Sequence, residues 1–154
     1  MEVKFERAAA DDTEALANVR NKSFYADYVK YGECPGYNKF IESMKSSILN
    51  RIAYKIICNG QLVGNVSLRD NKDNTYYLGC LCIIPEYENK GIGQKAVRFI
   101  ESQFPGAICW TLETPADKDK NLYFYKKMGY TITNEYMHGT VKVVLFEKKL
   151  INHV

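Results

Sequence analysis

Hydrophobic and polar positions follow two different periods along the chain. A period of two, or a short apolar run between turn residues, predicts strands at residues 3–9, 53–58, 61–68, 75–84, 107–113, 130–137 and 141–149. Apolar residues three and four positions apart predict helices at residues 14–28, 38–49, 91–104 and 121–128. The second of these helices is expected to carry its apolar stripe on Phe40, Ile41, Met44 and Ile48.

Glycine and asparagine mark the turns that separate these elements. Asn59-Gly60 favours a type I′ hairpin turn, and His138-Gly139 joins the last two strands. The strand at 75–84, the helix after it and the strand at 107–113 form a crossover, so these two strands should be parallel. We predict the order β-α-α-β-β-β-α-β-α-β-β and an α/β fold. Its sheet is mixed and mostly antiparallel, with about seven strands flanked by helices, in a single domain of residues 1–154.

Residues 78–101 join a buried strand to a helix through a loop that contains glycine. An apolar run ends at Pro85, a polar loop follows, and Gly91 and Gly93 begin the helical pattern. Free N–H groups and the positive end of the helix dipole favour an anion here, and glycine lets phosphates approach the backbone. The alternative is a helix that follows a flexible loop, with Lys90 and Lys95 solvated. We favour the anion site.

Composition and charge exclude several classes of protein. The 154 residues carry a net charge of +3, with 25% charged and 46% hydrophobic residues, which is ordinary for a globular protein. This charge is too small to indicate nucleic acid. No signal peptide or membrane-spanning apolar run is visible, so we expect no membrane association.

The cysteines indicate a reducing compartment. Their number is odd and most lie in apolar runs, which predicts reduced core residues and a cytoplasmic location: Cys34, Cys58, Cys80, Cys82 and Cys109. Cys80 and Cys82 are two apart on one strand and so share a face, but no second pair of ligands accompanies them. We therefore expect no metal site.

A dinucleotide fingerprint is an alternative interpretation of the glycine loop. Residues 91–96 fit G-x-G-x-x-A, and Glu113 follows Gly93 by twenty residues, as the ribose ligand of such a site would. However, residues 85–90 separate the strand from the first glycine, whereas in the fingerprint the glycine follows the strand directly. The preceding half of the chain also lacks a stack of βαβ units, so a dinucleotide-binding protein remains a minor alternative.

Two motifs carry a resemblance to a known family. The first is Glu88-Asn89-Lys90-Gly91-Ile92-Gly93, and the second is Phe124-Tyr125-Lys126-Lys127-Met128-Gly129-Tyr130. They resemble the Q/R-x-x-G-x-G/A and F-Y-x-K-x-G-F patterns of the GNAT N-acetyltransferase superfamily, and the order of elements fits nearly the whole chain. Glu88 departs from the first pattern. Lys118 stands where members often have an asparagine, and Asn121 is expected to serve instead.

The resemblance implies acetyl-CoA as the co-substrate. In this family the strand equivalent to 75–84 separates from the strand equivalent to 108–114, and the pantetheine arm enters the gap. The resemblance also implies that a backbone N–H near Ile83 polarises the thioester carbonyl and that the pyrophosphate lies on the amides of residues 88–93. The implied cofactor-binding residues are Ile83, Ile84, Glu88, Asn89, Lys90, Gly91, Ile92, Gly93, Gln94, Lys95, Asn121 and Tyr125.

Two proton transfers accompany direct attack of an amine on the thioester. The motif places Tyr125 where the family's general acid usually lies, and the alternative is a helix tyrosine that only packs on the sheet. Tyr77 stands where many members have a glutamate base, so Glu113 is the better candidate, unless it is merely an exposed carboxylate at a strand end. The two are twelve residues apart, the interval found in members that resemble the ribosomal-protein N-terminal acetyltransferases.

The acceptor is the least defined part. The first two helices and their loop carry tyrosines and a carboxylate that could form a pocket for a cationic amine or could lie on the surface: Tyr25, Tyr28, Tyr31, Glu33 and Tyr37. The sequence does not distinguish among a polyamine, an aminoglycoside, an amino acid and a protein N-terminus as the acceptor. We predict an N-acetyltransferase that acts on a small-molecule or peptide amine. The sequence leaves open whether the protein forms a homodimer. The rival class is a module that senses acetyl-CoA without turnover.

Overall fold

The computed structural model describes residues 1–150, which form seven strands and four α-helices in the predicted order. The strands are β1 (Val3–Arg7), β2 (Ile52–Cys58), β3 (Gln61–Asp70), β4 (Thr75–Ile83), β5 (Cys109–Pro115), β6 (Thr131–His138) and β7 (Val141–Lys149). The helices are α1 (Thr13–Tyr31), α2 (Ile41–Asn50), α3 (Ile92–Gln103) and α4 (Asp119–Lys127), with 3₁₀ turns η1 (Ala10–Asp12) and η2 (Pro85–Tyr87).

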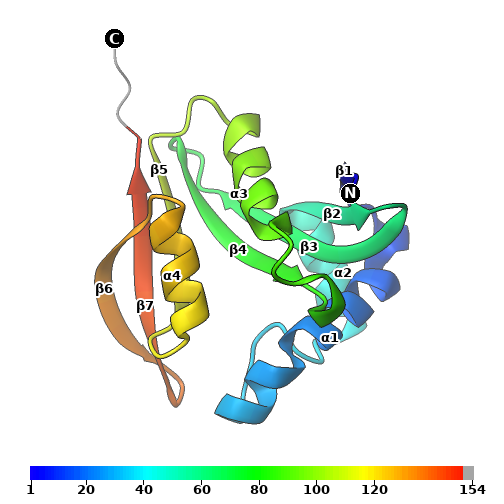
Figure 1. Cartoon of the computed structure of the whole chain (residues 1–154), viewed down its shortest axis with the longest axis horizontal. Helices are drawn as coiled ribbons and strands as arrows, with labels where there is room; N and C mark the ends of the chain where they lie inside the picture. The colour runs from blue at the N-terminus through cyan, green and yellow to red at the C-terminus, as the bar shows by residue number, and fades with distance from the viewer. Residues whose placement is uncertain (151–154) are drawn as a thin grey trace.

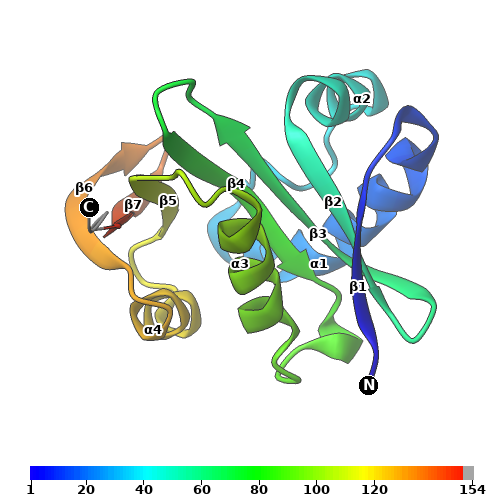
Figure 2. The same cartoon turned by 90° about the horizontal axis from the view of Figure 1, so that it is seen from above.

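All of these strands belong to one sheet, in the order β1-β2-β3-β4-β5-β7-β6 (Figure 1). Neighbouring strands are antiparallel except β4 and β5, which are parallel. Helices α1 and α2 cover one face of the sheet, and α3 and α4 cover the other (Figure 2). The mixed, mostly antiparallel α/β sheet and its parallel step are confirmed.

The main core lies between the sheet and the helices α3 and α4. Tyr76 of β4 stacks on Trp110 of β5 with ring centroids 4.9 Å apart, and Phe104 packs against both. Trp110, Tyr130 and Phe146 are among the largest fully buried side chains. This aromatic packing fixes β4 against β5 at one end of their length, which matters because the strands separate at the other.

Strands β4 and β5 pair only over Thr75–Tyr77 and Cys109–Thr111, and beyond Tyr77 they diverge. The separation implied by the family resemblance is therefore present. Past this point the edge of β4 that faces β5 has no partner strand among residues 1–150. A strand edge of this kind leaves N–H and C=O groups free to pair with a ligand.

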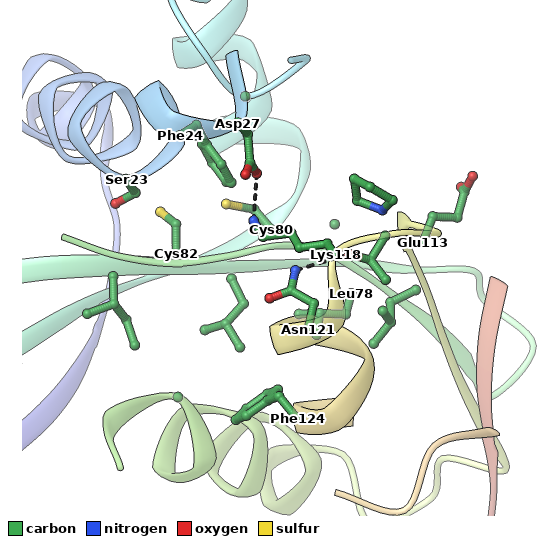
Figure 3. A pocket seen from close by; sticks show the side chains of 18 of the residues that line it. Ser23, Phe24, Asp27, Leu78, Cys80, Cys82, Glu113, Lys118, Asn121 and Phe124 are labelled. Carbon is green, nitrogen blue, oxygen red and sulfur yellow. Dashed lines mark hydrogen bonds and ion pairs between the residues drawn. The ribbon is translucent and has the colours of Figure 1, made fainter. Parts of the chain in front are cut away.

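A β-bulge changes which side chains of β4 face each layer. Ser67 of β3 pairs with Cys80 and Leu68 pairs with Leu78, so Gly79 is the extra residue. Before the bulge Tyr76 faces the α3 layer, whereas after it Ile83 does, with its Cδ1 next to Gly93. Cys80 and Cys82 therefore face α1, on the opposite side of the sheet, as Figure 3 shows.

Most local predictions are confirmed, with shifts at the ends of elements. Asn59 and Gly60 have φ of 50° and 82°, as a type I′ turn requires. Helix α1 extends to Tyr31 and ends at Gly32, whose φ of 75° stops it. The prediction for α2 is partly wrong: Met44 and Ile48 are buried, but Ile41 is exposed, and Phe40 precedes the helix and is 84% exposed.

Candidate active site

A cavity of about 890 Å³ opens where β4 and β5 separate. Ser23, Phe24 and Asp27 of α1 line it on one face of the sheet, and Asn121 and Phe124 of α4 line it on the other (Figure 3). Its volume falls within the range of roughly 300–1,000 Å³ that is common for small-molecule and cofactor sites. The cavity thus extends to both layers of helices.

The loop before α3 lines this cavity with Glu88, Asn89 and the residues from Gly91 to Gln94. Left-handed backbone at Asn89 (φ 60°) and Gly91 (φ 80°) turns the chain into the helix. Glu88 N–H bonds Pro85 and Lys95 N–H bonds Gly91, but within residues 1–150 no backbone acceptor is recorded for the N–H groups of residues 89–94. Free donors at a helix N-terminus favour an anion, so the anion site stays a prediction that this geometry fits.

Gly93 lies in the tightest part of the loop. A Cβ on this residue would lie 3.3 Å from the ring of Phe124 and 3.7 Å from Ile83 Cδ1. Gly93 therefore lets the loop, β4 and α4 approach one another around the cavity. Gly91 has open space at its Cβ position, and its left-handed φ is what favours glycine there.

Most of the predicted cofactor-binding residues line the cavity. They are Ile83, Glu88, Asn89, Gly91, Ile92, Gly93, Gln94, Asn121 and Tyr125, whereas Ile84, Lys90 and Lys95 are not in its lining. Ile84 is 3% exposed, and its N–H donates to Val63 O at 2.8 Å. Because successive residues of a strand point to opposite edges, the N–H and C=O of Ile83 and Leu81 face the gap.

Asn121 and Lys118 link α4 to the rest of the cavity wall. Asn121 Nδ2 donates to Thr114 Oγ1 of β5 at 3.0 Å. Lys118, where the family often has asparagine, instead forms an ion pair of 2.6 Å with Asp27 of α1 (Figure 3). This ion pair crosses the cavity from one layer of helices to the loop before α4. Glu88 is likewise paired, with Lys120 at 3.0 Å.

Tyr125 lies inside the cavity wall with a hydroxyl that no described residue binds. The side chain is 7% exposed and packs between Phe124, Tyr130 and Phe146. Among residues 1–150 no hydrogen bond to its hydroxyl is recorded, and the residue lines the cavity. Burial, followed by negative charge on Cys80 and Cys82, raises the pKa of Tyr125, so it keeps its proton at neutral pH.

Glu113 reaches the cavity from the other face of the sheet. Trp110 and Thr114 of β5 face α3 and α4, so Glu113, of opposite parity, faces the α1 side. Tyr77 donates a hydrogen bond to Glu113 Oε1 at 3.0 Å. Burial and then the contact with Glu113 raise the pKa of Tyr136 to about 12. The sequence did not indicate these two tyrosine neighbours, because they come from β4 and β6, which the strand order places on either side of β5.

The aromatic acceptor pocket is only partly formed. Tyr31 and Glu33 line the cavity, where Tyr31 donates to Asp117 at 2.7 Å and Glu33 accepts from the N–H of Thr140. Tyr25, Tyr28 and Tyr37 do not line it. Tyr28 stacks on Tyr37 with centroids 4.6 Å apart, and Tyr25 is 57% exposed. For these three residues the surface alternative is the correct one.

Two features are absent from residues 1–150. No helix in this range is both long and apolar enough to cross a membrane. In the same range, no cluster of three or more His, Cys, Asp or Glu side chains is suited to a metal ion.

Comparison with known proteins identifies the family. The acetyltransferase (GNAT) family model matches residues 13–130. The uncharacterised protein YrkN of Bacillus subtilis (strain 168) is 31% identical over 113 residues, which is 69% of this chain and 60% of that protein. The chain thus spans about three fifths of the length of this curated relative.

Two solved structures share the fold. The PaiA N-acetyltransferase of Thermoplasma acidophilum, in complex with coenzyme A, has a TM-score of 0.79 at 20% identity and covers 97% of this chain and 100% of its own. The ribosomal-protein-S18-alanine N-acetyltransferase of Escherichia coli has a TM-score of 0.81 at 11% identity, with 99% and 97% covered. From the family match over most of its length, the chain belongs to the acetyltransferase (GNAT) family.

Proposed function

We propose that this protein transfers the acetyl group of acetyl-CoA to a primary amine by direct attack in a ternary complex. One observation carries the proposal: Asn89 and residues 91–94, whose N–H groups have no backbone acceptor within residues 1–150, line the same cavity as the unpaired edge of β4 at Ile83. The first set suits a pyrophosphate, and the second suits the amide groups of a pantetheine arm. The Thermoplasma acidophilum relative, whose structure contains coenzyme A, supports this assignment.

The two layers of the cavity fit the two partners of the reaction. The cofactor would enter between α3 and α4, and the amine would approach from α1, where Glu113 lies. The N–H of Ile83 or Leu81 would stabilise the developing oxyanion. Tyr125, which keeps its proton, would give it to the departing thiolate, while Glu113 would take the proton of the amine. Proximity of the two bound substrates accounts for much of the expected acceleration.

Coenzyme A is expected to raise the melting temperature, whereas NAD is not. A ligand at a hundred times its dissociation constant adds about 2.7 kcal/mol, and each kcal/mol corresponds to about 2–4 °C at this size. Thermal melts with CoA, acetyl-CoA and NAD measure the difference. Stabilisation by NAD and not by CoA would contradict the proposal and favour the dinucleotide alternative.

Turnover separates an enzyme from an acetyl-CoA sensor. Pools of primary amines are incubated with the protein and acetyl-CoA, and the release of free CoA thiol is followed. A rate that depends on both protein and amine excludes a module that only binds. Binding of acetyl-CoA with no thiol release from any pool would favour the sensor.

Loss of CoA binding is expected when a branched side chain enters the glycine loop. Gly93→Val places atoms against Phe124 and the phosphate path, and Gly91→Val forces a β-branched residue into left-handed backbone. Either change should abolish the CoA-dependent shift in melting temperature. Lys90→Ala is the control and should weaken binding by only about 0–1 kcal/mol, as for a screened surface charge. A severe effect of Lys90→Ala, with mild effects of both valines, would show that side-chain charge holds the phosphates.

A further inference from the structure

Three cationic side chains converge on the end of the cavity that lies under α1 and α2. Arg20 comes from α1, Lys39 from the loop between the helices, and Arg51 from the residue that follows α2, and all line the cavity. Arg20 is 7% exposed, and its Nε donates to Asn65 Oδ1 at 2.8 Å. Lys39 Nζ donates to Ser47 Oγ at 2.8 Å. These neutral partners orient the cations without neutralising them.

No carboxylate in the described part of the chain forms an ion pair with these cations. The ion pairs recorded for residues 1–150 include none of Arg20, Lys39 and Arg51. Asp27 lines the same cavity, but Lys118 holds it at 2.6 Å. Burial first, and then the charges of Arg20 and Arg51, lower the pKa of Lys39, which shows that the cations repel one another. An anion in their midst would offset both effects.

The floor of this region is shaped for a small polar group. Gly79, the bulge residue, has no side chain, and a Cβ there would lie 2.7 Å from Arg51 Nη1. The guanidinium therefore lies directly on the strand. Beside it Ser67 is 3% exposed and lines the cavity, with its Oγ 3.9 Å from the position that a Cβ on Gly79 would take. A serine hydroxyl in the wall of a cavity can donate a hydrogen bond to a ligand.

We propose that Arg20, Lys39, Arg51 and Ser67 form an anion subsite that binds a carboxylate or phosphate group of the acceptor. The acceptor is then an amine that also carries an oxyanion, such as an amino acid or a phosphorylated amine. The inference rests on the proposed acetyl transfer. The anion subsite would also orient the acceptor, because it would hold the oxyanion of the acceptor and direct the amine to Glu113 on β5. This acceptor, which carries an oxyanion as well as an amine, replaces the cationic amine that the tyrosines and Glu33 suggested in the sequence.

The Cys80 thiolate is the competing partner for these cations. Cys80 faces α1 beside them, and the hydrogen bond from Cys82 followed by the charges of Arg20, Lys39 and Arg51 lowers its pKa. One thiolate, however, supplies a single negative charge against three positive ones. The subsite therefore retains positive charge for a second anion even when Cys80 is ionised.

Matched acceptor pairs test the proposal in the full-length protein. Each L-amino acid is compared with its amide, and phosphoethanolamine with ethanolamine, by following thiol release from acetyl-CoA. The anionic member should have a kcat/KM at least about tenfold higher, as one charged hydrogen bond supplies. The amine of the amide is less basic than the amine of the amino acid, so a larger fraction of it is present as the reactive free base. This difference favours the amide and therefore works against the proposal.

Arg51→Met is the discriminating variant because it removes one charge and keeps most of the side-chain volume. It should raise the KM of the anionic acceptor by roughly 10- to 100-fold and leave the KM of its neutral partner and the binding of CoA unchanged. Arg98→Met, which removes an exposed arginine of α3 outside the cavity, is the matched control. Cys80→Ala should keep the preference for the anionic member.

The other outcomes of these experiments separate failure of the anion subsite from failure of the proposed acetyl transfer. Faster turnover of the neutral members by the wild type, or equal losses in Arg51→Met and Arg98→Met, overturns the anion subsite but leaves acetyl transfer intact. A preference for the anionic member that appears only in Cys80→Ala, and not in the wild type, assigns the cations to the thiolate instead. Failure of CoA to stabilise the wild type overturns the proposed function itself.

A binding measurement keeps the test decisive if no acceptor in the panel is turned over. Inorganic phosphate is titrated in melts at saturating CoA, so that the pyrophosphate site is already filled. Phosphate should then stabilise the wild type and Arg98→Met, and not Arg51→Met. Equal stabilisation of all three proteins overturns the proposal.

Discussion

Replacing Tyr125 by phenylalanine is expected to lower kcat by about 10²–10⁴-fold, the range typical of a lost general acid. The change removes one hydroxyl and little volume. Among residues 1–150 that hydroxyl has no recorded hydrogen bond, so no internal bond is lost. The ring contacts with Tyr130 and Phe146 remain available to phenylalanine. Folding and CoA affinity should therefore change little, and steady-state kinetics with CoA-dependent melts separates the two effects.

The matched control for this variant is Tyr130→Phe. Tyr130 is also buried and aromatic, but it lies outside the cavity lining and donates its hydroxyl to Glu101 at 3.0 Å. Its replacement should lower stability by about 1.5–3 kcal/mol, as for a hydrogen bond to a charged group, and leave kcat close to that of the wild type. If Tyr125→Phe keeps full activity, the proton reaches the thiolate from another group or from water, and Tyr125 only packs.

The fold could be predicted from the sequence because its signals are local. Periods of two and of three to four residues mark the elements, and Asn59-Gly60 and Gly32 occupy left-handed positions that these residues accept readily. The glycine loop was predictable for the same reason, since a strand, a loop and a helix that follow one another bring free N–H groups together without help from distant residues.

The orientation of individual residues around β4 could not be predicted, because it depends on register. A glycine in a strand is compatible with a bulge, but only the pairing of Ser67 with Cys80 and Leu68 with Leu78 places it at Gly79. Likewise Ile83 and Ile84 look equivalent in the sequence. Bonding of Ile84 N–H to Val63 turns it away from the gap and leaves Ile83 facing it.

The acceptor side was the least predictable because residues far apart in the sequence build it. Arg20, Lys39 and Arg51 meet only after α1 and α2 pack on the same face of the sheet. In the sequence Tyr28 and Tyr37 belong to a cluster of aromatic residues, but in the structure they stack on each other outside the cavity. Composition could suggest a ligand-binding surface there, but it could not give the sign of its charge.

Replacing Glu113 by glutamine is expected to slow turnover near neutral pH, by about 10²-fold or more, and to allow recovery as the pH rises. A primary amine with a pKa near 10 is mostly protonated at pH 7 and needs a base before it can attack. Above that pKa the amine is deprotonated without help, so the variant should approach the wild type. Glutamine keeps the size of the side chain and can still accept the hydrogen bond from Tyr77.

The pH dependence of kcat/KM distinguishes a base from a carboxylate that only attracts the substrate. A binding role would raise KM in Glu113→Gln by a similar factor at every pH at which the amine is charged, with kcat preserved. A role as base lowers the rate most at low pH, and the difference shrinks along the titration of the amine. Glu135→Gln removes an exposed carboxylate of β6 that is paired with Lys142 at 2.7 Å, and it should leave the profile unchanged. A flat ratio of variant to wild-type rates across the pH range would rule out Glu113 as the base.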